Sequence, residues 1–395
     1  MFLLVFLLII YAIRKVYKAC LVGNKQVDSM NERLQEFVGA EVVGQLFTPY
    51  NPLDNVNIPA GTVYGRYGSI PENMEIGRIN VAYFTSIEEI FHDERCGHEI
   101  PDSVQSGLPY SVDGHFKGSL ERLVDTLNSE RGISVDGEHY KLSDHFNLVA
   151  VVYDDDTQRP RYEEGPVLFD GWPWDKNAEV IQRWDNGTTS VTLDSISHNM
   201  PSIWRRVNGN RVGKYTVKRS HEEQIVRFLY ENQIDLLLTD SWLPIFTDEI
   251  IRRFYGHIVN LHPAITNPSN PNRVPGLTPT SDVYQRYLET GYNKTGATLH
   301  FTNLEIDDGC IIFDNEATVI DPVIQEDCHD ENMSRIRILN YDTKQNVLES
   351  GLMRLVHNNQ FRGSVLKIRD YGQLYMERMR LERELEKYRR GSDEN

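Results

Sequence analysis

The chain has 395 residues, enough for one large domain or two ordinary ones, and its 40% hydrophobic content is typical of a protein that buries a core. The net charge of −17 argues against non-specific nucleic-acid binding, which requires clustered lysine and arginine, but leaves room for a local anion site. The four cysteines have no Cys-x-x-Cys spacing, so neither a metal site nor a disulfide framework is indicated.

Residues 1–24 form a hydrophobic N-terminal segment. Its apolar run, Phe2–Ile13, is followed by basic residues and shows no small-residue cleavage site. The run is shorter than the roughly 20 apolar residues that span a bilayer. Two interpretations stay open: a short membrane anchor that leaves the body of the protein cytoplasmic, or an accessory helix. Residues 25–77 are expected to be an extended lead-in.

The next part of the chain contains three predicted elements and two polar stretches. Strands are predicted over Arg78–Thr85 and Phe146–Tyr153, which are β-branched and apolar. Gly118–Asn128 has apolar residues at helical spacing and is predicted to be a helix. The polar stretches 86–111 and 154–212 show no clear periodicity, and we interpret them as insertions.

The second half of the chain continues the alternation of helices and strands. The predicted elements are helices over Ser220–Asn232 and Thr247–Tyr255 and strands over Ile234–Leu238 and Ile258–Leu261. Ser220 would cap the first helix, with Glu223 completing a capping box. Strands that alternate with helices predict an α/β fold with a mostly parallel sheet flanked by helices and a site at the carboxyl ends of the strands.

The C-terminal region is predicted to be helical. Met333–His357 suits a helix that closes the domain, and residues 361–395 form a charged C-terminal helix and tail. Within the latter, Tyr371–Arg390 has glutamate and arginine at helical spacing, which is typical of a solvated helix.

Polar side chains follow two apolar runs. The first run begins at Ile258 and ends in Asn260 and His262. These two residues lie two positions apart and therefore point to the same face of a strand. A second run carries His300 and is followed, just before a turn, by Asp307. Each motif alone is a common cap or turn, but together they supply an amide that stabilises an oxyanion, an imidazole that carries a proton and a carboxylate that orders both.

The pattern resembles the folate-dependent formyltransferases, and among them the phosphoribosylglycinamide formyltransferases. The family's Asn-x-His-Pro strand end and its Gly-x-x-x-His-Phe…Asp-x-Gly turn stand here at 260–263 and 296–309. The resemblance implies Asn260, His262 and Asp307 as the catalytic residues.

The resemblance also implies a fold and a reaction. Residues 78–360 would form a Rossmann-like catalytic domain, the formyltransferase fold, with the two polar stretches as insertions. The domain would transfer a formyl group from 10-formyltetrahydrofolate, without a metal, to a primary amine in the cytoplasm. The implied acceptor is 5-phosphoribosylglycinamide, of de novo purine biosynthesis.

Binding residues are implied as well. The cofactor would contact Asp240, Ser241, Trp242, Leu243, Ile245 and His300. The acceptor would contact Lys117, Gly118, Ser119, Pro275 and Gly276. Gly118 and Ser119 precede a helix and would present N–H groups to a phosphate, with Lys117 adding charge. Here the sequence departs from the family's Gly-Ser-Asn, with Ser119 at the asparagine position.

Three alternatives stay open. Deformylases that release formate usually have His-His after the asparagine, and His262-Pro263 favours transfer instead. Insertions, including 265–274, point to altered substrate use, such as an amino-sugar acceptor. The third alternative is a non-catalytic folate-binding scaffold. The acidic chain makes tRNA a poor partner.

Overall fold

The structure is a computed structural model that divides the chain into two units, residues 50–370 and residues 1–49 with 371–395. It describes residues 76–86, 111–112, 115–116, 118–129, 132–135, 138–154, 174–200, 215–242, 244, 246, 248–276, 278–303, 307, 309–320 and 329–392. The predicted N-terminal segment, the lead-in as far as residue 75 and most of the stretch 86–111 lie outside these residues.

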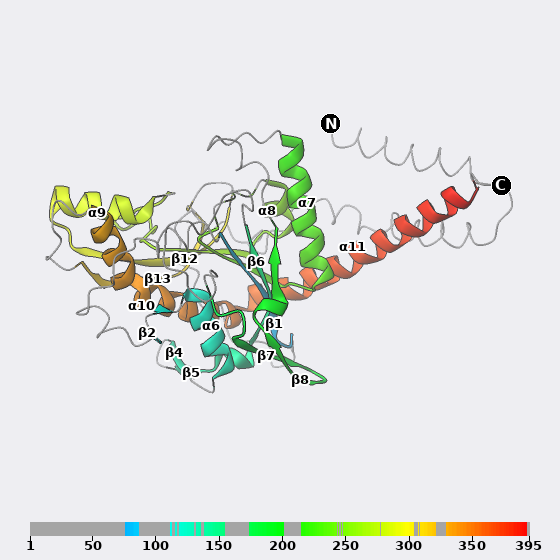
Figure 1. Cartoon of the computed structure of the whole chain (residues 1–395), viewed down its shortest axis with the longest axis horizontal. Coiled ribbons are helices and arrows are strands. Elements are labelled where there is room, and N and C mark those ends of the chain that lie inside the picture. Colours follow the sequence, from blue (N-terminus) through cyan, green and yellow to red (C-terminus); the bar gives the residue numbers. More distant parts are fainter. Residues whose placement is uncertain are drawn as a thin grey trace. The chain divides into compact units, whose positions relative to one another are not determined.

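A seven-stranded sheet forms the centre of unit 50–370 (Figure 1). Its order is β13-β12-β11-β10-β1-β6-β9. The bounds are β1 Ile79–Thr85, β6 Phe146–Tyr153, β9 Ser197–Asn199, β10 Leu236–Asp240, β11 Ile258–His262, β12 Lys294–Phe301 and β13 Ile311–Val319. Strands β11, β10, β1, β6 and β9 run parallel to one another. Strand β12 pairs antiparallel with β11 on one side and with β13 on the other. The predicted mostly parallel sheet is confirmed.

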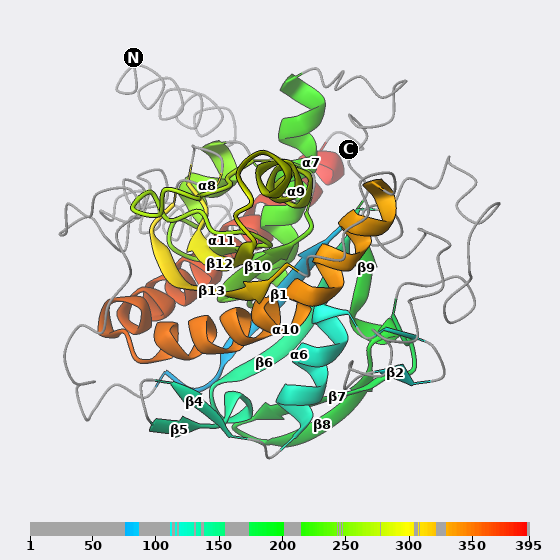
Figure 2. The same cartoon turned by 90° about the vertical axis from the view of Figure 1, so that its left-hand side faces the viewer.

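Helices cover both faces of the sheet. Helices α6 (Ser119–Asn128) and α10 (His329–Val356) lie side by side on one face (Figure 2), and α7 (Tyr215–Glu231) and α8 (Asp248–Arg253) contact each other on the other. The chain moves from β1 through α6 to β6 in one direction, then returns through α7 to β10 in the other. Right-handed crossovers in opposite directions place their helices on opposite faces.

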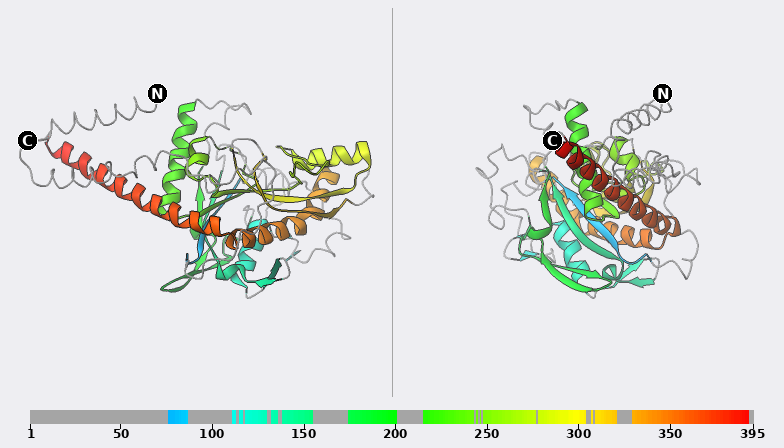
Figure 3. Two further views of the ribbon diagram at one scale, coloured as in Figure 1. Left: turned by 180° about the vertical axis from the view of Figure 1, so that it is seen from behind. Right: turned by 90° about the vertical axis from the view of Figure 1, so that its right-hand side faces the viewer.

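Helix α9 (Pro279–Thr290) lies beside the N-terminal part of α10 (Figure 3). Asn332 of α10 donates its side-chain amide to the Tyr284 hydroxyl of α9 at 3.0 Å. Smaller elements complete the unit: β2 Ser111–Val112, β3 His115–Phe116, β4 Ile133–Val135, β5 Glu138–Tyr140 and the 3-10 helices η1 Leu142–Asp144 and η3 Asp194–Ile196.

The polar stretch 154–212 contains strands that the sequence analysis missed. β7 (Glu179–Trp184) and β8 (Gly187–Thr192) form a hairpin, and β9 then joins the edge of the sheet. β8 is almost wholly exposed, so its sequence lacks the apolar residues from which a strand is predicted. The overlooked signal is the turn between the paired Trp184 and Gly187. Gly187 has a positive φ of 136°, which glycine adopts readily.

Several predicted boundaries were wrong, among them the start of α10, which lies at His329 rather than Met333. Helix α7 begins at Tyr215, so Ser220 lies inside the helix and does not cap it. Strand β10 ends at Asp240 rather than Leu238, which extends it to the edge where the candidate site lies. The other predicted strands and α6 are confirmed to within two residues.

A buried ion pair holds the amino ends of β1 and β10. Arg369 of α11 (Asn359–Ser392) donates Nε to Oδ1 of Asp235 at 2.8 Å and Nη2 to Oδ2 at 2.6 Å. The guanidinium also donates to the carbonyl oxygens of Arg78 and Ile76. The backbone N–H of Asn80 donates to Asp235 at 2.9 Å, and Asp235 is only 1% exposed. One carboxylate therefore joins the starts of two neighbouring strands to α11.

The described part of the second unit, 371–392, is the remainder of α11. It carries arginine–glutamate pairs at helical spacing, including Arg378 with Glu382 at 2.9 Å and Arg380 with Glu377 at 2.6 Å. The predicted charged helix is confirmed and begins earlier, at Asn359. No helix among the described residues is long and apolar enough to cross a membrane.

Replacing Arg369 by Met should destabilise the protein by about 3–5 kcal/mol, because Asp235 would stay buried without its counter-charge. Urea unfolding would measure the change. The double variant Asp235→Asn with Arg369→Met should recover part of the loss. Arg227→Met, which removes an exposed pair with Glu231, should cost only about 0.3–0.5 kcal/mol. Equal losses of stability in Arg369→Met and Arg227→Met would contradict a stabilising role of the ion pair between Arg369 and Asp235.

Candidate functional site

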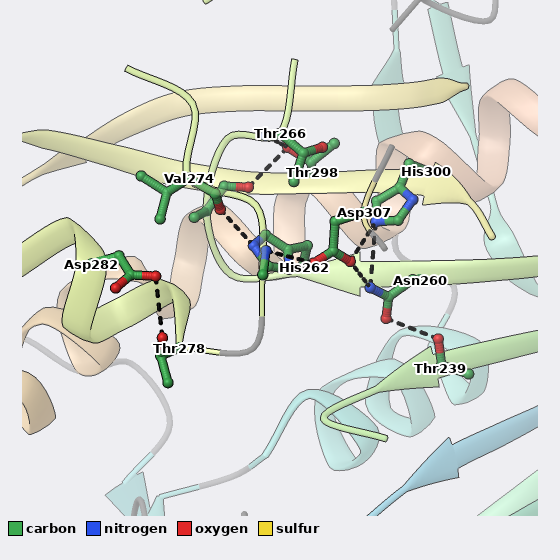
Figure 4. A network of polar contacts seen from close by, with 12 residues as sticks. Thr239, Asn260, His262, Thr266, Val274, Thr278, Asp282, Thr298, His300 and Asp307 are labelled. Atoms are coloured by element: carbon green, nitrogen blue, oxygen red, sulfur yellow. Dashed lines mark hydrogen bonds and ion pairs between the residues drawn. The ribbon is translucent and has the colours of Figure 1, made fainter. Parts of the chain in front are cut away.

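The Asp307 carboxylate gathers the polar residues at the end of β11 (Figure 4). Its Oδ1 accepts from Nδ2 of Asn260 at 3.1 Å and lies 3.4 Å from Nε2 of His300. Its Oδ2 accepts from the backbone N–H of Gly276 at 2.9 Å and lies 3.4 Å from Nδ1 of His262. The structure therefore brings together the three residues that the resemblance names as catalytic, with His300 and Gly276 as further members.

The orientation of the Asn260 amide is set from β10. Thr239 Oγ1 lies 2.9 Å from Oδ1 of Asn260, and Thr239 pairs with Asn260 across the two strands. The ionised Asp307 carboxylate can only accept, so Nδ2 of Asn260 faces Asp307 and the amide oxygen faces the Thr239 hydroxyl. Thr239 escaped the sequence analysis, because nothing in the apolar run of β10 marks it as a partner of Asn260.

His262 presents Nδ1 to Asp307. Its Nε2 lies 2.8 Å from the carbonyl oxygen of Val274, which can only accept, so Nε2 carries a proton. Burial lowers the pKa of His262 below its usual value, and the charge of Asp307 opposes that shift. A neutral His262 therefore holds a lone pair at Nδ1, and a proton gained there would be stabilised by Asp307.

His300 has a similar arrangement. Its Nδ1 lies 3.0 Å from the carbonyl oxygen of Phe301 and donates to it. Its Nε2 lies 3.3 Å from Nδ2 of Asn260 as well as near Asp307. A neutral His300 accepts from the Asn260 amide, whereas a protonated one donates to Asp307. The sequence analysis assigned His300 to the cofactor, but in the structure its polar contacts are with the Asp307 cluster and a backbone carbonyl.

The turn that carries Asp307 depends on close backbone contacts. Asp307 has a φ of 53°, and a Cβ on Gly309 would lie 1.6 Å from the carbonyl oxygen of Phe301. Only glycine allows that approach. The donors around the carboxylate outweigh its burial, which by itself would raise the pKa. The His300 hydrogen bond, the charges that the two histidines carry when protonated, and the Gly276 N–H bring the pKa of Asp307 to about 2.

The expected cofactor loop follows β10. Both carboxylate oxygens of Asp240 already contact side chains of the chain: Oδ2 accepts from the Tyr83 hydroxyl, and Oδ1 lies close to Lys344 and Ser241. Ser241 has a φ of 56°, and its carbonyl accepts from a backbone N–H of residue 86. Trp242 packs edge-on against Phe84, with ring centroids 5.1 Å apart. Residues 243 and 245 lie outside the described part of the chain.

The expected acceptor residues are only partly brought together. Gly276 contacts Asp307, and the carbonyl of Val274, from the expected insertion, contacts His262, so this loop closes over the catalytic cluster. Gly118 donates its N–H to Oε2 of Glu121 at 3.0 Å, in a capping arrangement of α6. Lys117 lies outside the described residues.

The arrangement suits proton transfer beside a developing negative charge. It combines an oriented amide, an imidazole whose Nδ1 lone pair faces a carboxylate, and a carboxylate that stays ionised. The described residues include no group of three or more His, Cys, Asp or Glu side chains suited to a metal ion.

Asp307→Asn should lower the pKa of His262 further, because the Asp307 charge is the main influence that raises it. Asparagine tolerates the positive φ of this position, so the turn should persist. Histidine NMR during a pH titration would measure the shift, with Asp282→Asn on exposed α9 as the control. A raised or unchanged pKa of His262 would contradict the described contact.

Comparison with known proteins bears on the family. Residues 187–347 match the formyl transferase family. A phosphoribosylglycinamide formyltransferase of Haemophilus influenzae is 31% identical over 140 residues, which cover 35% of this chain and 60% of that protein. A formyltetrahydrofolate deformylase of Synechocystis is 25% identical over 140 residues, 34% of this chain and 46% of that protein. The chain thus spans only part of the length of these relatives.

A solved structure extends the likeness to the fold. The N10-formyltetrahydrofolate-dependent formyltransferase PvdF of pyoverdin biosynthesis is 23% identical, with a TM-score of 0.50 over 70% of this chain and 98% of that chain. The expected formyltransferase fold is therefore confirmed. The matched residues and the curated relatives support a folate-dependent formyltransferase family for this chain, in agreement with the motifs found in the sequence.

Proposed function

We propose that the protein transfers a formyl group from 10-formyltetrahydrofolate to a primary amine. The observation that carries the proposal is the convergence of Asn260, His262 and His300 on the ionised Asp307, at the carboxyl ends of parallel strands. Ligands of open α/β sheets bind at that edge. The family match supports the folate donor.

In the proposed reaction the neutral amine nitrogen attacks the formyl carbon, and the carbonyl electron pair moves onto oxygen. The Asn260 amide donates one of its two hydrogens to that oxyanion, in place of its contact with His300. His262 takes up the proton that the amine nitrogen loses, at Nδ1, and becomes a cation beside the oxyanion and Asp307. A water ordered by Asp307 completes the proton path.

The carbonyl then re-forms, and the bond between the formyl carbon and N10 breaks. His262 returns its proton, through the ordered water, to N10 of the departing cofactor. The products are the formylated amine and tetrahydrofolate, so the proton lost by the amine equals the one gained by N10. His262 begins and ends neutral, consistent with its lowered pKa.

The first candidate acceptor is 5-phosphoribosylglycinamide, in de novo purine biosynthesis, because the relative from Haemophilus influenzae carries that name. A second candidate is a different amine, such as an amino sugar. Glu121 favours the second, because it already occupies the Gly118 N–H that a phosphate would need. The chain would act in the cytoplasm in either case.

Asp307→Asn should reduce turnover by about 10²–10⁴-fold, the usual effect of removing a group that orients an acid–base catalyst. The assay would use the full chain with 10-formyltetrahydrofolate and a panel of primary amines. Asp282→Asn should retain wild-type turnover. Wild-type turnover in a folded Asp307→Asn variant would refute the assigned role.

A folate analogue that cannot transfer its formyl group should bind and change the fluorescence of Trp242, which lies in the expected cofactor loop. Trp242→Phe should remove the fluorescence change, whereas the rise in melting temperature on binding should persist in reduced form. Binding of the analogue, together with no transfer from 10-formyltetrahydrofolate to any amine of the panel, would favour the scaffold alternative. No binding at all would contradict both.

A further inference from the structure

A lysine outside the predicted site forms a largely buried ion pair beside it. Lys344 of α10 places Nζ 2.6 Å from Oδ1 of Asp240, and the two side chains are only 14% and 6% exposed. The other oxygen, Oδ2, accepts from the Tyr83 hydroxyl at 2.5 Å. Burial and the Asp240 charge hold the pKa of Tyr83 well above its usual value, so Tyr83 remains a donor.

The attachment of α10 places Lys344 over the candidate site. Asn340, one turn earlier on the same face of the helix, donates to the carbonyl oxygen of Pro263 at 3.0 Å and to that of Gly296 at 2.7 Å. Pro263 directly follows His262. This part of α10 is therefore fixed against the chain that leaves the end of β11.

The position of Asp240 gives the same placement from the sheet side. Asp240 is the last residue of β10 and pairs with Leu261 of β11. The residue before it, Thr239, holds the Asn260 amide. The ammonium group of Lys344 therefore lies at the carboxyl edge that carries Asn260, and its charge also acts on His262.

The hydrogen-bonding capacity of Lys344 is not used up by this pair. An ammonium group has three hydrogens to donate, and Asp240 is its only partner among the described residues. Arg369 differs, because its guanidinium donates to Asp235 and to two backbone carbonyls. The remaining hydrogens of Lys344 are therefore available to a further acceptor.

We propose that Lys344 binds an anionic group of the acceptor, a phosphate or a carboxylate, and so determines which amines are formylated. The proposal rests on the formyl transfer proposed above. Asp240 and Tyr83 hold the lysine in place, and the bound anionic group would leave the amine end of the acceptor free to reach Asn260. Lys344 would then supply the charge that the sequence analysis assigned to Lys117.

Kinetics with paired acceptors test the specificity. Phosphoribosylglycinamide would be compared with its dephosphorylated riboside, and glycine with glycinamide, so that each pair differs in one anionic group. The wild type should prefer the anionic member of one pair, which identifies phosphate or carboxylate. Lys344→Met should raise the KM of that member about tenfold or more and leave its neutral counterpart unchanged, as expected for the loss of a charged hydrogen bond.

Two variants control for charge alone. Lys344→Arg keeps the cation and should retain most of the preference. Lys294→Met removes an exposed lysine at the start of β12 and should behave as the wild type. Equal effects of Lys344→Met on the anionic and neutral members would show that Lys344 is only a counter-ion of Asp240, and would overturn the proposal.

Direct anion binding separates this proposal from the reaction itself. Calorimetric titration with inorganic phosphate and with acetate should detect a site in the wild type that Lys344→Met lacks, even where no amine is formylated. No binding of either anion to the wild type would overturn the proposal. If Lys344→Met does not fold, Asp240→Asn with Lys344→Met removes both charges, and this double variant should fold without binding the anion. Retained binding would contradict the role of Lys344.

Discussion

The buried carboxylate of Asp307 is the interaction on which the arrangement of the site depends. Its contacts come from β11, from β12 and from the loop that precedes α9, so one side chain joins three segments that are distant along the chain. A buried carboxylate stays ionised only when donors outweigh the cost of burial, and the low pKa of Asp307 shows that they do. The same donors fix which atoms of Asn260 and His262 face the site.

The two ends of strand β10 have different roles. Its start is joined to α11, and its end lies at the candidate site. Its interior leucines are fully buried between the helix layers. A buried aspartate lies just before it, Asp235, and another ends it, Asp240, and each is paired with a cation from a C-terminal helix. The guanidinium of Arg369 donates to several groups, whereas Lys344 has one partner among the described residues. We therefore assign Arg369 a structural role and propose Lys344 as a binding group.

Local sequence signals predicted the strands that are buried on both faces and missed the exposed strand β8. Strands β1, β6 and β11 are buried, and their β-branched apolar runs identify them. Strand β8 is exposed and consists largely of Thr and Ser, so burial leaves no trace in its composition. The start of α7 was misplaced because the Ser220 motif has the form of a capping box but lies within a longer helix.

The sequence by itself indicated the mostly parallel α/β architecture, the resemblance to the formyltransferases and the polar cluster of Asn260, His262 and Asp307, because strand periodicity and short motifs depend only on neighbours along the chain. The tertiary structure decided what those residues contact. The contacts of Asn260 with Thr239, of Asp307 with Gly276 and of Asp240 with Lys344 join positions that are 21, 31 and about a hundred residues apart. No local pattern encodes such pairs, because packing of the helices against the sheet brings them together.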